Sequence, residues 1–512
     1  MSTQAQTTIE IPAEVRNATP ERTPDSPASP LRGMMILGAG TLAVTGLTIV
    51  VTRIYSLRYG PENLSAVLIF RIYGSVLLGL FGLGMPIALQ RNVAFLAGTS
   101  RHAGKVALLG LGIGTGSFGA ACIVSALFSA KIATYLQHPG LGAVWEAFLV
   151  LAFVQAFGCM LGLIQIARNR WMEASALTAA TMGVAPLLPL IFLPRGSLGG
   201  ALLWSAAAAG IFALPSFLEI CRWSLGEGLR GAGREIKLLL GYGLPRAVGN
   251  AAEPILDLML PWLALVSGAG IMGAGGFAIG LALLRPLNPV TGAMSLILTP
   301  AAAKLAARGD AAAQAIQMHR ITEWAVQIGL FSTVQLVVWA DVLVGLWLGP
   351  GYNTATGTVR IICLSLAPSF FYASIRGIID GENALPINTL NLLASIAVLL
   401  TAAAAARFLR TGNAALAVSY LLSRVMLGWL TMRYVIRTHA PDLRKLRVGS
   451  ALALALGFGA VAVAARGFLP REYGPLALVV LAPVSLAGFV AVLGASGTEW
   501  ARYLLVRAGA TS

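Results

Sequence analysis

The chain has 512 residues, of which 57% are hydrophobic and only 11% are charged, and its mean hydropathy is +0.79. Because a typical soluble domain is about 25% charged, this composition excludes a soluble globular protein. The apolar runs are long and continuous, whereas a transmembrane barrel needs alternating segments of about ten residues. The sequence therefore predicts an all-α polytopic membrane protein.

Residues 1–31 differ from the rest of the chain. Prolines punctuate a polar stretch that is rich in Thr, Ser and Glu, which is typical of a disordered segment. No short basic region precedes a short apolar core and a cleavage site, so we do not expect a cleavable signal. The stretch is predicted to be a disordered cytoplasmic tail.

About 14 transmembrane helices follow this tail. The first six form a predicted N-lobe (32–230), the next six a C-lobe (231–440), and the last two a C-terminal pair with a cytoplasmic end (441–512). The predicted helices span residues 33–52, 64–88, 106–129, 144–166, 174–194, 198–218, 238–267, 272–300, 322–346, 357–377, 386–406, 413–432, 449–467 and 473–495.

Lys and Arg are distributed unevenly between the loops. They concentrate in the segments 222–237 and 433–447, whereas 267–272 and 346–357 carry none. Since cytoplasmic loops carry the excess of positive charge, both termini are predicted to be cytoplasmic. The net charge of +16 arises mostly from these basic cytoplasmic loops, which attract anionic membrane lipids. It does not indicate a nucleic-acid partner.

A faint internal repeat relates the two lobes. Arg71 precedes Pro86 by fifteen residues, and Arg285 precedes Pro300 by the same interval. Because the matched helices lie six apart, both members of a pair cross the membrane in the same direction. The pattern predicts a parallel pseudo-repeat with its axis along the membrane normal, and chance similarity is the alternative.

Two helices carry a polar face. Thr45, Thr48 and Thr52 lie on one face of the first helix, spaced by about one turn. Threonine hydroxyls there either line a cavity or bond back to their own helix. In the seventh helix, the same spacing brings the charged residues Glu253 and Asp257 onto the face of Arg246.

Charged residues inside membrane helices cost about 3 kcal/mol each on insertion scales, so they face a cavity or a partner. Arg71, Arg246 and Arg285 are predicted to bind phosphate, because a guanidinium matches phosphate oxygens in a fork geometry. The alternative is an ion pair with an acid of the bundle, such as Glu253 or Asp257. Those two carboxylates are themselves predicted to couple transport to protons or Na⁺, or else to hold a permanent ion pair.

Other chemistry is not indicated. The four cysteines form no CxxC pair, and the four histidines fall in predicted loops. The segment GTSRHAGKV (98–106) departs from a phosphate-binding loop in its glycine spacing and in Val106. We predict no cofactor, no metal and no ATP site.

Residues 239–310 resemble the central segment of Wzx-type polysaccharide flippases, which belong to the multidrug/oligosaccharidyl-lipid/polysaccharide exporter (MOP) superfamily. The resemblance rests on YGLPR (242–246), on a glycine-rich turn that ends at Gly276-Phe277, and on Pro300 before a basic loop. YGPENLSAVLIF (59–70) is similar to the first outer turn of that family.

The resemblance implies a positively charged cavity between two lobes that flips an undecaprenyl-pyrophosphate-linked oligosaccharide across the bacterial inner membrane. The pyrophosphate would lie among Arg71, Arg246 and Arg285, and the sugars along the threonine face. Membrane lipids and further polysaccharide-assembly proteins are the other expected partners.

Two rival functions stay open. One is a multidrug or cation exporter of the same superfamily, which would use acidic residues to hold its substrate. The other is a membrane enzyme of polysaccharide assembly, such as a polymerase or glycosyltransferase, which would need a large outer loop. No such loop is seen, so a non-enzymatic transporter is expected.

Overall fold

The computed structural model describes residues 30–97, 102–136, 140–193, 196–225, 232–287, 310–382, 387–409, 412–439, 446–468 and 473–502, with isolated residues between 291 and 302. Every structural statement below concerns these residues. The predicted disordered tail (1–31) lies almost entirely outside them. Most of the second half of the helix predicted at 272–300 does so as well.

All regular elements in the described ranges are helices, which confirms the predicted all-α membrane fold. Eleven of them are long and apolar enough to cross a membrane, or twelve if the bent pair α14 and α15 is one span. That count takes α2 once, although it is two helices joined at Gly60, and it omits the 35-residue α10. Including both gives the fourteen crossings predicted.

The helices of the first half are α2 (Pro30–Phe81), α3 (Met85–Ala97), α4 (Ala103–Ala126), α5 (Ser129–Tyr135), α6 (Leu141–Ala167), α7 (Trp171–Thr178), the π-helix η1 (Ala179–Val184), α8 (Leu188–Phe192) and α9 (Leu198–Leu225). Those of the second half are α10 (Ala232–Val266), α11 (Gly270–Leu284), η2 (Arg285–Leu287), α13 (Ala311–Leu348), η3 (Pro350–Ala355), α14 (Thr356–Cys363), α15 (Leu366–Glu382), α16 (Ile387–Phe408), α17 (Asn413–His439), α18 (Val448–Phe468) and α19 (Gly474–Ala495).

The first transmembrane helix is longer than predicted. It was expected to end at residue 52, but it continues to the turn at Gly60, whose φ is 80° and ψ 170°. A left-handed φ favours glycine, and Pro61 then starts the next helix with its fixed φ. The helix therefore ends at a glycine–proline pair and not where its side chains become polar.

Three other predicted helices are interrupted. The helix predicted at 64–88 breaks between α2 and α3, where Gly84 has a φ of 67°. The one predicted at 174–194 passes through a π-helical turn before α8. The one predicted at 357–377 bends by 49° between α14 and α15, because Pro368 has no N–H for the carbonyl of Leu364.

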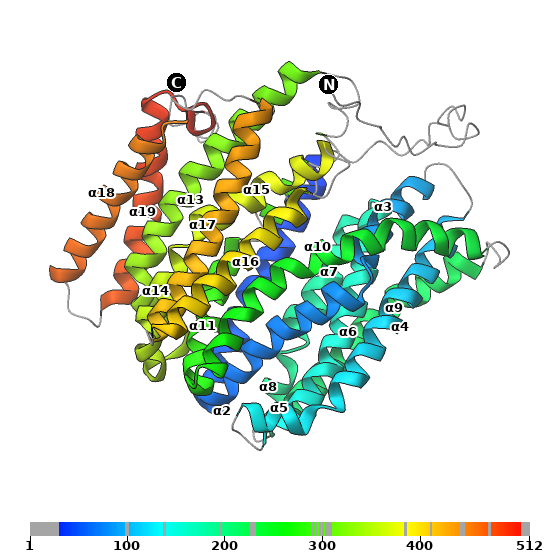
Figure 1. The fold of residues 1–512 in the computed structure, drawn as a ribbon. Coiled ribbons are helices and arrows are strands. Elements are labelled where there is room, and N and C mark those ends of the chain that lie inside the picture. The colour runs from blue at the N-terminus through cyan, green and yellow to red at the C-terminus, as the bar shows by residue number, and fades with distance from the viewer. Residues whose placement is uncertain are drawn as a thin grey trace.

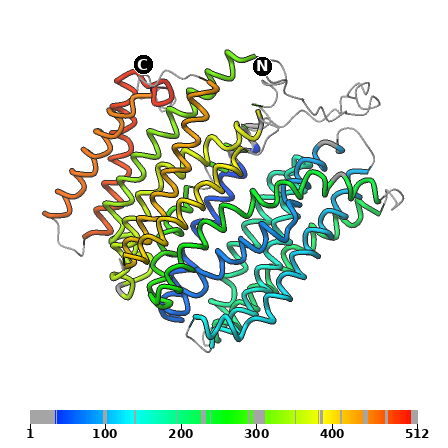
Figure 2. The backbone as a smooth tube through the Cα atoms, in the orientation of Figure 1, coloured from blue at the N-terminus to red at the C-terminus, as the bar shows by residue number. Residues whose placement is uncertain are grey.

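The helices form two bundles that lie side by side (Figure 1). One holds α2 to α9 and the other α11 to α17, with α18 and α19 packed outside α13. The chain enters α2 and leaves α19 at the same end of the molecule (Figure 2), which we call the terminal end. The opposite end, where α2 turns at Gly60, is the distal end.

Helix α10 joins the two bundles (Figure 1). Near its start, Leu239 is fully buried in the core of the first bundle with Met85 and Leu89. Further along, Ala252 packs with Tyr372 and Leu392 of the second bundle. One continuous helix therefore contacts both halves in turn.

The fold and the distribution of Lys and Arg generate a topology prediction. Reporter fusions at Gly196 and Gly412 are expected to lie outside the cell, and a fusion at Asp310 inside. Paired alkaline phosphatase and fluorescent-protein fusions measure this, with a fusion at the C-terminus as the inner control. Consistent inversion of the fusions after residue 267 would contradict the orientation of the second half.

Candidate functional site

A cavity of about 1140 Å³ lies between the two bundles. Its walls come from both limbs of α2 and from α6, α11, α13 and α19. Three arginines lie among the described lining residues, and no Asp or Glu does. The wall is otherwise mostly apolar, with Phe118, Phe148, Phe331 and Trp347 as its aromatic side chains.

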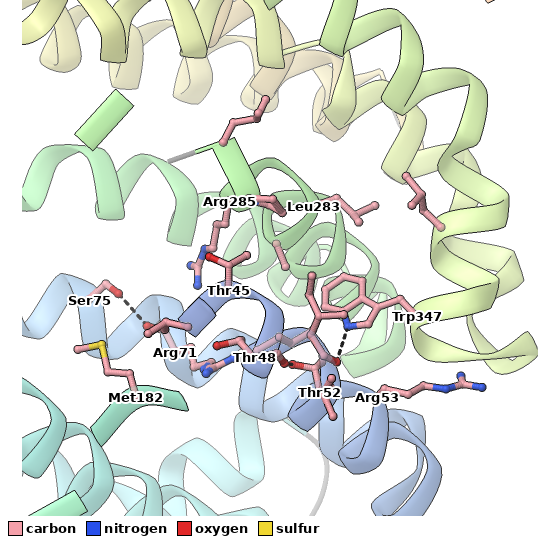
Figure 3. Close-up of a pocket in the computed structure, with 18 of the residues that line it drawn as sticks. Thr45, Thr48, Thr52, Arg53, Arg71, Ser75, Met182, Leu283, Arg285 and Trp347 are labelled. Atoms are coloured by element: carbon pink, nitrogen blue, oxygen red, sulfur yellow. Dashed lines mark hydrogen bonds between the residues drawn. The ribbon is translucent and has the colours of Figure 1, made fainter. Parts of the chain in front are cut away.

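Arg71 and Arg285 come from the two halves and line the same part of this cavity (Figure 3). Their positive charges are close enough to repel each other. Within the described part of the chain, neither guanidinium has a hydrogen bond or an ion pair; only the backbone carbonyl of Arg71 accepts one, from Ser75. Two cations without an ion pair in the described structure give this part of the wall a charge that is complementary to an anion.

Arg285 reaches this position at a helix end. It was predicted inside a helix over 272–300, but α11 ends at Leu284 and Arg285 starts the 3-10 turn η2. Pro286 follows directly and removes a backbone donor, which ends the regular helix at the cavity wall. The end of the helix thus lets the Arg285 side chain reach the cavity.

The predicted threonine face also lines the cavity: Thr45, Thr48 and Thr52 all contribute to its wall. Thr45 donates to the carbonyl of Thr41 (2.9 Å), and Thr52 donates to that of Thr48 (2.6 Å). The threonine face therefore does both things considered above: it lines a cavity, and two of its hydroxyls bond back to their own helix. The hydroxyl protons satisfy the helix, while the oxygen lone pairs can still accept a hydrogen bond from a ligand.

Arg53 is the third lining arginine, and the sequence analysis missed it. It lies one residue beyond the end of the helix predicted at 33–52. Its Nη1 atom is buried without a hydrogen-bond partner in the described structure. In Figure 3 its side chain extends away from Arg71 and Arg285. The Gly60–Pro61 pair, which marks the true end of this helix, would have placed Arg53 inside the helix.

The two halves are joined at the distal end of the cavity. Ser56 donates to the carbonyl of Leu348 (2.5 Å), and Trp347 donates through Nε1 to that of Ile49 (3.2 Å). The Tyr352 hydroxyl donates to the carbonyl of Pro61 (3.0 Å). These contacts hold α2 against α13 and η3 at the distal end of the cavity, where Ile49 and Trp347 also line its wall.

The structure places Arg246 away from Arg71 and Arg285. Its side chain is exposed and stacks over Tyr242 with the guanidinium carbon 4.0 Å from the ring centroid. It does not belong to the described lining of the cavity. Of the three arginines predicted to bind phosphate together, the structure brings Arg71 and Arg285 to one cavity and leaves Arg246 outside its described lining.

Glu253 and Asp257 are also outside the cavity lining, and each has an arginine partner. Arg376 contacts Glu253 at 3.2 Å, and Arg424 pairs with Asp257. Arg424 also lies 3.8 Å from Glu253. Arg376 lies in the middle of α15 rather than near a helix end, because α15 continues beyond the end predicted at residue 377. The partners of the two carboxylates are thus α15 and α17, and not Arg246.

Tyr420 completes the Arg424–Asp257 pair. Its hydroxyl donates to Asp257 (2.8 Å) and accepts from Nε of Arg424 (2.8 Å). Arg424 is only 3% exposed, so its charge depends on these partners. Asp257 also attracts Arg285 electrostatically without forming an ion pair in the described structure. The ionic cluster of α10 is therefore a neighbour of the cavity.

No protein-family profile and no curated protein sequence matches this chain significantly. Solved structures do match its fold. The flippase MurJ for lipid II, in an inward closed conformation, aligns with a TM-score of 0.63 at 11% identity, covering 90% of this chain and 99% of that one.

Two MATE transporters match to a similar degree. An inward-facing MATE-family transporter of the MOP superfamily aligns with a TM-score of 0.61 at 16% identity over 81% of this chain and 99% of that one. The MATE transporter VcmN of Vibrio cholerae, in its bent form, gives 0.59 at 16% identity over 80% and 96%. The chain is thus a multi-pass membrane protein with the fold of MOP-superfamily transporters.

The buried ion pair generates a stability prediction. Changing Arg424 to Met is expected to destabilise the protein by about 3 kcal/mol, because it leaves Asp257 without its buried partner. Adding Asp257→Leu should restore part of the loss. Thermal unfolding in detergent, followed by tryptophan fluorescence, measures both variants.

Arg320→Met is the control for this prediction. Its ion pair with Glu499 is 65% and 69% exposed, so its loss should cost less than about 1 kcal/mol. Equal destabilisation by Arg320→Met and Arg424→Met would mean that the buried ion pair contributes no more to the free energy of unfolding than an exposed one.

Proposed function

We propose that this protein is a flippase that moves an undecaprenyl-pyrophosphate-linked oligosaccharide across the bacterial inner membrane for polysaccharide biosynthesis. The observation that carries the proposal is the charge of the cavity: three arginines and no carboxylate line its described wall. The pyrophosphate binds Arg71 and Arg285, and sugar hydroxyls donate to the threonine face of α2. No chemical step on the substrate is part of the proposal.

The arrangement of the two halves supports alternating access. Hydrogen bonds join the halves at the distal end, and the bundles spread apart toward the terminal end (Figure 1). With both termini in the cytoplasm, as the loop charges predict, the cavity would receive its ligand from the cytoplasmic side. Breaking the distal contacts would then release the ligand outside.

A multidrug exporter is the second candidate, because two of the aligned structures are MATE transporters. That fold likeness supports both functions equally. The absence of Asp and Glu from the described cavity wall favours an anionic substrate over a lipophilic cation. Efflux of a fluorescent lipophilic cation from cells measures the rival directly.

The first test removes the cavity arginines. Arg71→Ala and Arg285→Ala are each expected to lower flipping of a polyprenyl-diphosphate oligosaccharide in proteoliposomes by about 10- to 100-fold, since a charge-assisted hydrogen bond contributes about 1.5–3 kcal/mol. Lysine at either position should restore part of the rate, because it keeps the charge and loses the fork.

Arg320→Ala, which changes an exposed arginine far from the cavity wall, is the matched control and should flip normally. Protein yield in the membrane is compared for every variant. Normal flipping by both cavity variants would place the diphosphate site elsewhere, and export of cations without flipping would favour the multidrug function.

The second test concerns coupling. Glu253 and Asp257 have resident arginine partners, which supports the permanent ion pair over a site that binds protons or Na⁺. We therefore expect Glu253→Gln with Asp257→Asn to lower stability but to leave the response to an imposed gradient unchanged. Flipping in vesicles with imposed proton or Na⁺ gradients measures it. Loss of the gradient response in a stably inserted variant would instead assign coupling to these carboxylates.

A further inference from the structure

A second cluster of unpaired positive charge lies where α3 meets α10. The Tyr242 ring carries two guanidinium groups, Arg91 at 4.2 Å and Arg246 at 4.0 Å from its centroid. Both arginine side chains are exposed. No carboxylate pairs with either of them in the described part of the chain, although Nη1 of Arg246 also donates to the carbonyl of Tyr242 (3.3 Å).

The backbone holds this cluster in place. A Cβ atom built on Gly84 would lie 2.1 Å from the carbonyl oxygen of Gly243, and one built on Gly243 would lie 2.6 Å from that of Leu83. The start of α3 therefore touches α10 without any intervening side chain. Because Tyr242 is adjacent to this contact, its position relative to Arg91 is fixed by main chain.

The depth of the cluster matches the edge of the membrane. Arg246 precedes the distal end of α10 at Val266 by twenty residues, which is about 30 Å of helix and equals the thickness of the hydrocarbon layer. A span that ends at Val266 would begin near Arg246, later than the predicted start at residue 238, and this would put the cluster at the level of lipid headgroups on the terminal side. By the predicted orientation, this is the cytoplasmic leaflet.

The contact between α2 and α10 connects this cluster with the cavity. Ser75 and Leu78 line the cavity on α2, and the next residue, Gly79, packs against Ala251 of α10. Five residues further, in the turn between α2 and α3, Gly84 packs against Gly243. The seam between these two helices thus runs from the wall that carries Arg71 to the paired arginines at the membrane edge.

We propose that Arg91 and Arg246, held on Tyr242, form a loading site for the diphosphate headgroup of a lipid in the cytoplasmic leaflet. Their guanidinium carbons are at most about 8 Å apart, because both lie close to one centroid. Each fork can bind one phosphoryl group of a diphosphate at ordinary hydrogen-bond distances. Two cations without a resident carboxylate suit a ligand with at least two negative charges.

This site rests on the proposed function but is separate from the cavity site. It binds the substrate before the headgroup reaches Arg71 and Arg285. The experiment is native mass spectrometry of the full-length protein in detergent, titrated with undecaprenyl diphosphate. The wild-type protein is expected to bind two lipid molecules, and Arg91→Gln with Arg246→Gln only one.

Matched variants separate the two sites. Arg71→Ala with Arg285→Ala should also bind one lipid, and the fourfold variant none. Arg433→Gln, which removes another exposed arginine that stacks on an aromatic ring (Trp429, 5.5 Å), should still bind two. Tyr242→Leu should weaken the loading site at least tenfold, and Tyr242→Phe, which keeps the ring, should not.

Three other results would overturn one part of the proposal each. Two bound lipids in Arg91→Gln with Arg246→Gln would overturn the loading site and leave the proposed function standing. Two bound lipids in Arg71→Ala with Arg285→Ala would instead overturn the cavity site alone. Equal competition by phosphatidylglycerol, or by inorganic pyrophosphate without a lipid tail, would overturn the assignment to a diphosphate lipid.

Discussion

The absence of water from the bilayer core is the constraint on which this structure depends. A charged side chain there needs a partner or a solvated cavity. The chain meets this need in both ways. Arg424 lies almost fully buried against Asp257 and Tyr420, whereas Arg71 and Arg285 form no ion pair in the described part of the chain and face the cavity. The paired arginine holds helices together, and the unpaired arginines give the cavity its positive charge.

The same constraint explains how much of the fold could be predicted. Long apolar runs have only one stable form in a membrane, so the helices and their order follow directly from the sequence. Their ends are harder, because polar side chains such as Arg53 can point into a cavity while the helix continues. Glycine and proline were the better guides: Gly60, Gly84 and Pro368 mark the observed breaks.

The site was predictable only in part, and the reason is geometric. Helical periodicity places Thr45, Thr48 and Thr52 on one face, and the structure brings that face to the cavity with Arg71. Periodicity cannot say which neighbour each face meets. The acids of α10 pair with arginines 123 and 167 residues away, and no local pattern relates those positions.

Helix α10 connects these separate features. Its start is held to the first bundle by the backbone contact at Gly243, and its middle is held to the second by the ion pair of Asp257. Any relative movement of the bundles must therefore be absorbed between these two anchors. Pro245 and Pro254 lie in that interval, and each removes a helical hydrogen bond. The chain thus places two prolines between these two fixed points, in the segment of α10 that a relative movement of the bundles would bend.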